Sequence, residues 1–482
     1  MRRAIAMGLA ALLALGAAAQ EAEGIDEDAL FGSEDEWLDQ VDEGQDDALA
    51  ALVVSEGVVL GGSVSGSLDA SWTWHDPWSG FDPAAPDEYG LQPGLSSLVF
   101  FDARPEEGSR VHASVKLGWP FASQRSFLTE ATIYENPLLS GEWHIATESE
   151  TVGIPNITVF ELFTDFAYND ALFFRFGKQT LNWGPGYFFS PANVLNIQTI
   201  DPLNPTAQLE GPLSVRAHLP VAGTQHNLWA YAVFDADTLK PEDTALAAKA
   251  EFVLGGWELS AGAWYAWERP LRGILTAAGS LDRVSVFSEA YLARGSDRTW
   301  VSDITTTLPF VETTTDDSSA FFKGTAGFMW TQSDWKLTVA GQYLYDGEGY
   351  EDSERERLID DAYANEADIK PILDPSGADP DEAFSSFLKG LILNSGRHYA
   401  ALSVAKSEFL HDDLSLSVFG VGNLSDWSGY ARLSLSWRVF KGMSLDAWSG
   451  FAFGLSDSEY LVLNDGPAVE VGLGLSLGST AF

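Results

Sequence analysis

Apolar and polar residues alternate along most of the chain after residue 58. Between residues 60 and 74 the even positions are apolar residues or glycine, and the odd positions from residue 63 onward are serine, threonine or aspartate. Side chains of a β-strand point alternately to the two faces of a sheet, so this period predicts strands with one apolar and one polar face. The same pattern recurs in the segments 110–119, 257–267, 335–345 and 429–439.

Aromatic residues stand at the ends of several apolar faces. Trp257 and Trp267 bound one such face, and Trp335 and Tyr345 bound another. Tryptophan and tyrosine are enriched where a protein meets the two membrane–water interfaces. An apolar face with aromatic ends is therefore typical of a strand that spans a membrane in a β-barrel, and the polar opposite face predicts an aqueous interior.

The connections between the strand segments alternate in length. Short turns are expected at 105–108, 169–171, 255–256, 295–297, 332–333, 407–411 and 441–442. Longer loops are expected at 75–94, 120–156, 182–211, 268–280, 309–318, 347–394 and 456–467. Short turns at one end and long loops at the other are typical of outer-membrane barrels. The pattern predicts an all-β, transmembrane antiparallel β-barrel of about 18 strands; a count of 16 stays open because the segment 298–308 is the least convincing strand.

One hairpin is defined well enough to predict individual contacts. A three-residue turn at 169–171 places Asp165 opposite Arg175 and Glu161 opposite Gln179, with all four side chains pointing inward. We therefore predict an ion pair between Asp165 and Arg175 inside the barrel. Two roles are open for this pair: it either neutralises charge in the wall or takes part in transport.

The N-terminal region predicts export to the cell envelope. Residues 1–20 combine a basic start with an apolar, alanine-rich run, which is typical of a cleaved signal peptide and too short for a spanning helix. Residues 21–47 then carry 13 acidic residues and no basic residue. We expect the segment 21–55 to be a disordered periplasmic tail, either solvated or docked on a partner or a pore mouth, followed by the barrel at 56–482.

Composition excludes several classes of function. The 482 residues include 70 acidic and 27 basic ones, for a formal charge of -43, which argues against a nucleic-acid partner. The chain has no cysteine and seven scattered histidines, so neither a disulfide scaffold nor a metal site is expected. Motifs of common hydrolases and nucleotide-binding enzymes are missing from the sequence. We therefore expect no cofactor and no enzymatic activity.

The segment 182–211 is unusual for a solvated loop because it is apolar and rich in proline. We expect it to fold inward and pack on the barrel wall, where it would narrow the interior. The residues predicted to form this constriction are Trp183, Tyr187, Phe188 and Asn193.

Two short motifs resemble those of known barrel proteins. The segment Arg175 to Gln179, followed by Trp183-Gly184-Pro185-Gly186, resembles a stretch of bacterial outer-membrane β-barrels, including the capsule-assembly lectin-like barrels. This resemblance implies an outer-membrane barrel and a surface-polysaccharide binder. The terminal Phe482 resembles the aromatic signal that the barrel assembly machinery recognises, although the apolar residues before it are shifted by one position.

The segment 347–394 is expected to be an external lid. It begins with a strongly acidic stretch and ends with apolar residues at helical spacing between Phe384 and Ile392. Such an amphipathic helix either gates the pore or simply buries its apolar face at the barrel rim.

The predicted interior carries both signs of charge. The side chains expected to line a pore are Arg110, Lys116, Glu161, Asp165, Arg175, Gln179, Arg216, Lys336, Arg432 and Arg438. An acidic mouth above such an interior would favour cations at entry.

These observations predict a porin-like channel of the outer membrane for passive diffusion of small polar solutes. The alternative is a plugged barrel that binds surface polysaccharide or serves as a surface-exposed adhesion protein. The expected partners are outer-membrane lipid, small polar solutes or surface glycan, and the assembly machinery, with no nucleic acid. The sequence leaves open whether the barrel is a monomer or a trimer.

Overall fold

The computed structural model describes residues 58–79, 82–105, 108–135, 143–169, 171–235, 240–305, 311–374, 380–455 and 457–478. The predicted signal peptide, the acidic tail and the terminal Phe482 lie outside these residues.

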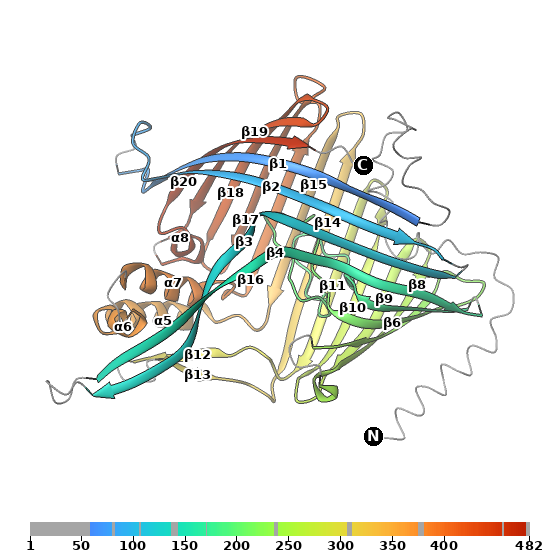
Figure 1. Ribbon diagram of the computed structural model, residues 1–482, viewed down its shortest axis with the longest axis horizontal. Helices are drawn as coiled ribbons and strands as arrows, with labels where there is room; N and C mark the ends of the chain where they lie inside the picture. The colour runs from blue at the N-terminus through green and yellow to red at the C-terminus, as the bar shows by residue number, and fades with distance from the viewer. Residues whose placement is uncertain are drawn as a thin grey trace.

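Eighteen antiparallel strands form one closed barrel (Figure 1). The first strand, β1 (Val58–His75), pairs with β2 (Glu88–Ala103) on one side and with the last strand, β20 (Ala468–Gly478), on the other. Each barrel strand thereby pairs with one strand on either side, as a wall surrounded by lipid requires. The fold class and the count of eighteen strands predicted from the alternation are therefore confirmed.

The other barrel strands follow one another around the ring in chain order. The first half consists of β3 (Ser109–Glu135), β4 (Trp143–Tyr168), β5 (Leu172–Lys178), β6 (Leu213–Pro220), β7 (Asn227–Val233), β8 (Ala245–Leu254), β9 (Trp257–Tyr265) and β10 (Leu271–Leu281). The second half consists of β11 (Val284–Arg294), β14 (Ala320–Gln332), β15 (Leu337–Asp346), β16 (His398–Lys406), β17 (Leu414–Asn423), β18 (Ser428–Phe440) and β19 (Met443–Phe453).

The connections divide the barrel into two ends. The turn end carries short connections such as 255–256 and 441–442, and the loop end carries the segments 179–212 and 347–397. Three boundaries predicted from the sequence are wrong. Most of the segment 268–280 is strand β10, whose alanines and glycines weaken the alternation. Residues 295–297 begin a connection at the loop end, and most of 120–156 belongs to the long strands β3 and β4.

The described part of the segment 298–308, residues 298–305, contributes no strand to the barrel. Its residues Trp300–Ile304 form β12, which pairs with β13 (Val311–Thr314) in a separate two-stranded sheet. This hairpin lies in the connection between β11 and β14, which accounts for the weak alternation of the segment.

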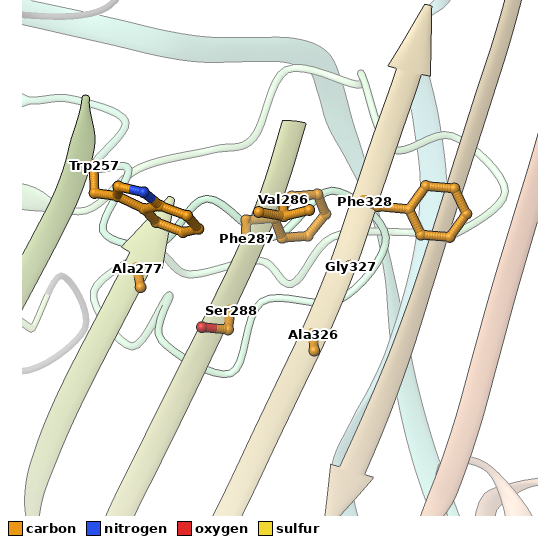
Figure 2. Close-up of a pocket in the computed structure, with 8 residues that line it drawn as sticks. All are labelled: Trp257, Ala277, Val286, Phe287, Ser288, Ala326, Gly327 and Phe328. Atoms are coloured by element: carbon orange, nitrogen blue, oxygen red, sulfur yellow. The ribbon is translucent and has the colours of Figure 1, made fainter. Parts of the chain in front are cut away.

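The outer face of the barrel is apolar, as the period-two pattern predicts. Leu60, Val64 and Leu68 of β1 are exposed on this face, and their odd-numbered neighbours point inward. A shallow recess of about 480 Å³ interrupts the outer face, where Ala277 of β10 and Ser288 of β11 lie side by side (Figure 2). The small side chains there leave space that a lipid chain can fill.

The register of the β4–β5 hairpin agrees with the prediction. Tyr168 pairs with Leu172, and Asp165 lies opposite Arg175. The Arg175 guanidinium donates two hydrogen bonds to the Asp165 carboxylate, at 2.6 and 2.9 Å, and lies 3.6 Å from the centre of the Phe163 ring. The predicted ion pair is therefore confirmed.

The expected opposition of Glu161 and Gln179 is not formed within the ladder. Pairing of β4 with β5 ends at Leu162 and Lys178, because the chain leaves the wall after Lys178. Gln179 is fully buried and donates a hydrogen bond to Ser214 of β6.

Four helices cap part of the loop end (Figure 1). They are α5 (Asp352–Ala364), α6 (Glu366–Leu373), α7 (Pro380–Ile392) and α8 (Glu459–Leu463). Phe384 and Leu388 of α7 pack with Leu358 of α5 and Ile304 of β12 in a small apolar core, so the amphipathic spacing predicted for this segment is confirmed. Among the described residues, the helices are too short or too polar to cross a membrane.

Replacing Asp165 by Asn tests the contribution of the hairpin ion pair. The variant loses a bidentate charged partner of the buried Arg175, so we expect the free energy of unfolding to fall by roughly 2 kcal/mol. Urea unfolding of the barrel in lipid vesicles measures this change. The control is Asp413→Asn, which breaks the pair with the exposed Arg438 and should cost less than about 1 kcal/mol. Equal effects of the two variants would contradict the buried role of Asp165.

Candidate functional site

The connection 179–212 folds into the barrel interior. It leaves the wall after β5 and returns at β6. Five of its apolar side chains are less than 5 % exposed, although none belongs to a helix or strand: Leu181, Trp183, Phe188, Ala192 and Leu195. We call residues 179–212 the inner loop. The expectation that this segment packs on the wall is thus met.

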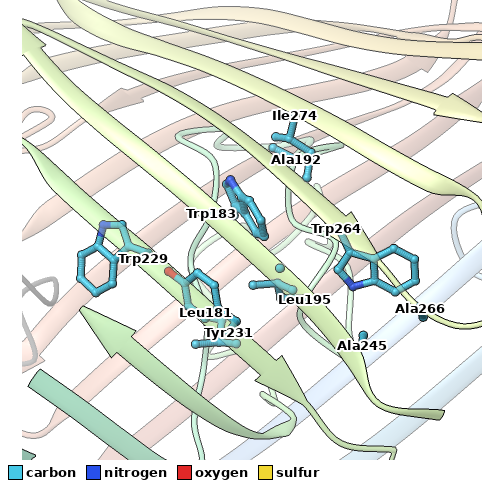
Figure 3. Close-up of a cluster of buried hydrophobic side chains, with 11 residues drawn as sticks. Leu181, Trp183, Ala192, Leu195, Trp229, Tyr231, Ala245, Trp264, Ala266 and Ile274 are labelled. Carbon is cyan, nitrogen blue, oxygen red and sulfur yellow. The ribbon is translucent and has the colours of Figure 1, made fainter. Parts of the chain in front are cut away.

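The first part of the inner loop packs on strands β7 to β10. Trp183 lies 5.7 Å from the Tyr231 ring and belongs to a buried cluster that includes Trp264 and Ile274 (Figure 3). Gly262 of β9 permits this packing, because a Cβ atom at that position would overlap the Trp183 indole.

The tip of the inner loop reaches the opposite wall. Phe188 packs against Ala340 of β15, Ala401 of β16 and Val421 of β17. In a ring of eighteen strands, β16 is nine places from β5, where the inner loop begins. The inner loop therefore crosses the whole width of the barrel.

Gln342 of β15 holds the tip by its side-chain amide. Its Oε1 atom accepts hydrogen bonds from the backbone N–H groups of Tyr187, Phe188 and Phe189, at 3.1, 2.6 and 3.3 Å. Its Nε2 atom donates to the Phe189 carbonyl and to Thr325. One side chain thus satisfies the backbone groups that the tip would otherwise leave without partners.

Glu289 of β11 holds the next part of the inner loop. Its carboxylate accepts hydrogen bonds from the backbone N–H groups of Gly186 and Ala192, at 2.6 and 2.9 Å, and from the Ser190 hydroxyl. Only 3 % of Glu289 is exposed. Gly184 is required beside it, because a Cβ atom there would overlap the carboxylate.

The inner loop leaves a polar cavity on the other side of the barrel. The cavity has a volume of about 590 Å³ and lies against the inner wall of β20, β1, β2, β3 and β4. Its lining includes hydroxyl groups and glycines of the wall, together with two side chains of the inner loop: Ser65, Ser67, Ser96, Ser476, Gly94, Gly118, Thr158, Gln198 and Glu210. Because β7 to β17 are covered by the inner loop, this cavity is where a solute has room.

The structure places the predicted pore-lining residues in several environments. Lys116 lines the polar cavity. Arg110 pairs with Asp102 at 2.6 Å, and Glu161 lies 3.8 Å from His112. These side chains share the inner wall of β2, β3 and β4 with the Asp165–Arg175 pair. Sequence alternation therefore predicted their direction correctly, but it could not show that most of their charge is internally compensated.

Four further predicted positions lie away from the polar cavity lining. Arg216 is buried with its guanidinium 5.5 Å from the Trp229 ring. Arg432 stacks on Trp448 at 4.2 Å. Arg438 pairs with Asp413 near the turn end.

Lys336 lies in the turn between β14 and β15, with a positive φ of 50° and a half-exposed side chain that pairs with Glu408. The predicted segment 335–345 thus begins two residues before β15, inside this turn.

The predicted constriction residues have structural contacts with the wall or within the inner loop. Trp183 and Phe188 are buried against strands, and Tyr187 packs edge-on against Phe188 at 4.7 Å. Asn193 accepts a hydrogen bond from Asn196. Glu289 and Gln342, which hold the inner loop, were not singled out from the sequence. Each is a polar residue at an inward position of an ordinary strand. Nothing in the sequence around it indicates that it binds the inner loop, which is about 100 residues or more away.

The described residues contain no group of three or more histidine, aspartate or glutamate side chains placed to hold a metal ion.

A buried carboxylate joins the helical cap to the barrel rim. Glu459 at the start of α8 is 1 % exposed and accepts hydrogen bonds from the Tyr399 hydroxyl, the Asn423 amide and the backbone N–H of Asn394. Its own backbone N–H donates to Asp426.

The same Asp426 carboxylate pairs with Arg355 of α5, so the two acidic side chains connect α5, α8 and the rim. Burial raises the pKa of Glu459 to about 7, with a smaller rise from the nearby Asp426 charge, while the three donated hydrogen bonds lower it.

Comparison with known proteins shows similarity only among solved structures. Neither a protein-family model nor a curated protein matches the chain. The chain of Pseudomonas aeruginosa OccK11 (OpdR) is 10 % identical with a TM-score of 0.43, covering 88 % of this chain and 97 % of that one. P. aeruginosa OccK5 (OpdH) is 7 % identical with a TM-score of 0.42, covering 88 % and 98 %. Salmonella typhi OmpF, in complex with daunomycin, is 9 % identical with a TM-score of 0.38, covering 88 % and 97 %.

Replacing Glu289 by Ala should release the inner loop. The change leaves three donor groups of the loop without their acceptor, at a cost of about 1 to 3 kcal/mol for each group that stays buried. We expect a larger and noisier single-channel conductance in a planar bilayer. The control is Glu258→Ala, which removes an inward carboxylate of β9 that accepts no described bond from the inner loop. Unchanged conductance of Glu289→Ala would show that other contacts hold the loop.

The buried Glu459 predicts that the cap is held more weakly at alkaline pH. The pKa of this carboxyl is about 7 in the folded chain, against an ordinary value of 4.5 in the unfolded chain. The neutral carboxyl therefore stabilises the folded cap fully below about pH 4.5, and this stabilisation is lost as the pH rises through 7. The difference corresponds to roughly 3 kcal/mol. Amide hydrogen exchange of α7 and α8, corrected for the intrinsic rate, should therefore quicken between pH 5 and 8.5. Glu459→Gln, which cannot ionise, should abolish this dependence; if it persists in that variant, another group is responsible.

Proposed function

We propose that the protein is a porin-like channel of the bacterial outer membrane through which small polar solutes diffuse passively. The observation that carries the proposal is the polar cavity of about 590 Å³ left beside the inner loop within a closed barrel. A barrel filled by a plug would bury both halves of its inner wall, whereas here one half faces a polar space.

The outer face supports a place in a membrane. Large apolar side chains are exposed all around the ring, among them Leu162 of β4, Leu275 of β10, Leu402 of β16 and Leu473 of β20, each more than half exposed. Exposing such a band to water would be costly, since apolar surface contributes about 25 cal/mol per Å² when it leaves water. Lipid around a closed barrel removes this cost and leaves every strand paired.

The passage follows the wall made by β19, β20, β1 and β2. The inward side chains of β20, β1 and β2 are mostly small in successive rows, with Asp446 of β19 beside them: Ser71, Gly472 and Gly90; Gly474 with Asp69, Gln92 and Asp446; Ser67, Ser476 and Gly94; Ser65, Gly478 and Ser96. Trp448 of β19 lies over Gly472. We call this surface the serine-glycine strip. The strip continues the polar cavity toward the loop end. It presents small hydroxyl side chains to a solute instead of large side chains that would block it.

A glycan-binding barrel is the second candidate. Trp78 and Trp427 lie in connections at the loop end, and each is 74 % exposed. Aromatic faces of this kind stack on sugar rings, and they also suit the membrane interface. Binding of surface polysaccharide by a chain that does not conduct would favour this candidate.

Replacing Ser67 by Trp tests the proposed passage. The indole would project from the serine-glycine strip into the cavity, so we expect single-channel conductance in a planar bilayer to fall by at least about half. The matched control is Leu68→Trp on the next residue, whose side chain faces outward and should leave the conductance unchanged. Equal conductance of the two variants would place the passage elsewhere, and a folded wild-type barrel without conductance would contradict the channel.

A further inference from the structure

We propose that two carboxylates on the serine-glycine strip, those of Asp69 and Asp446, make the passage selective for cations and for solutes with an ammonium group. This inference rests on the proposed channel function and adds the residues that would set its selectivity. It follows from the pairing of strands β19, β20 and β1, from the way other inward charges are compensated, and from the adjoining cavity.

Asp69 and Asp446 flank a single glycine. Gly474 of β20 pairs with Asp69 of β1 on one side and with Asp446 of β19 on the other. Neighbouring strands are about 4.8 Å apart, so the two aspartates belong to strands about 10 Å apart with no side chain between them. A Cβ atom at Gly474 would lie 2.8 Å from the Asp69 Oδ1 atom and 3.5 Å from the Asp446 Cβ atom. The Asp69 carboxylate thus extends over the glycine toward Asp446.

Several other inward carboxylates have cationic or hydrogen-bonding partners. Asp102 pairs with Arg110, and Asp165 with Arg175. Glu251 pairs with Lys249.

At the loop end of the strip, Glu470 accepts a hydrogen bond from the Tyr430 hydroxyl, and Glu88 lies 3.4 Å from His75. These contacts reduce the electric field that Glu470 and Glu88 present to a passing ion.

Asp69 and Asp446 differ from these groups. Within the part of the chain that the structure describes, neither forms an ion pair, and Asp446 has only a 3.5 Å contact with the Ser444 hydroxyl. Arg432 of β18 stacks on Trp448, and Lys116 of β3 lines the adjoining polar cavity. The two negative charges are therefore directed at the passage.

The pair lies beside the polar cavity. Ser67 and Ser476 line the cavity, and each lies two residues from Asp69 or Gly474 in the direction of the turn end, about 7 Å away. A solute that follows the strip between the loop end and the cavity passes the aspartates. At such short range a carboxylate attracts a cation and repels an anion even in water, and salt screens it little.

The first experiment measures the reversal potential of single channels under a gradient of potassium chloride. We expect the wild-type barrel to prefer potassium to chloride. The double variant Asp69→Asn and Asp446→Asn, which keeps the shape of both side chains, should lower the permeability ratio at least about threefold with little change in conductance.

The control removes the same charge from the helical cap. Glu356→Gln and Asp360→Asn change two exposed acidic residues of α5 and should alter the ratio far less than the strip variants. A larger effect of the α5 variants would show that the outer mouth sets the selectivity, which overturns the proposal.

A second experiment changes the charge after folding. The chain has no cysteine, so Asp69→Cys introduces a single thiol. A thiol reagent carrying an ammonium group, added to the bath, should shift the permeability ratio further toward chloride, and one carrying a sulfonate should restore the preference for potassium. No shift with either reagent, in channels whose labelling mass spectrometry confirms, would overturn the role of this position.

The outcomes separate this inference from the channel function. A conducting barrel whose permeability ratio is the same in wild type and double variant contradicts the role of the two aspartates and leaves the channel in place. A folded barrel that does not conduct contradicts both.

Discussion

The hydrogen bonds that hold the inner loop decide which part of the barrel interior is filled. A loop of irregular structure carries backbone N–H groups that find no strand partner, and inside a barrel these groups must be satisfied by the wall or by water. Here Gln342 accepts three of them and Glu289 accepts two more, from strands on the far side of the ring. Trp183, which precedes these anchored residues, and Phe188 at the tip pack on the covered wall. The polar cavity of about 590 Å³ lies on the other side of the interior, against β20, β1, β2, β3 and β4.

Charge inside the barrel follows the same division. Burying an ion without a partner is costly, so side chains in the tightly packed region must be compensated. The Arg175 guanidinium forms a bidentate pair with Asp165 and lies on the face of the Phe163 ring. Lys249 forms an ion pair with Glu251. Where water has access, a carboxylate needs no partner, which is consistent with the lone aspartates on the serine-glycine strip. Isolated charge and open space therefore belong together in this interior, and both point to the same wall as the passage.

The sequence predicted the barrel well because its signal is local. Alternation within ten residues gives the direction of each side chain, and a three-residue turn gave the Asp165–Arg175 pair without any distant information. It fails where the local signal is weak: the pattern predicts a loop for the alanine- and glycine-rich β10, and a strand position for Lys336, which lies in a turn. The inward direction of the inner loop was predictable from its apolar composition. The residues that anchor the loop were not predictable from the sequence. Glu289 and Gly186 are 103 positions apart in the chain, and no pattern in either segment indicates the other. The roles of the predicted lining residues in transport remain predictions.

The glycines of β20 are best explained by the passage. Glycine in the interior of a strand is unfavourable by roughly 0.5 to 1 kcal/mol relative to alanine, and it offers no side chain to pack. Gly472 and Gly474 nevertheless occupy two successive inward positions of the strand that closes the barrel. At Gly472 a Cβ atom would overlap the Trp448 indole, and at Gly474 it would crowd the Asp69 carboxylate. Larger residues would therefore lift Trp448 off the wall and push Asp69 away from Asp446. The cost in strand stability is offset by a wall flat enough to leave a passage and by a gap through which two carboxylates can act on the same solute.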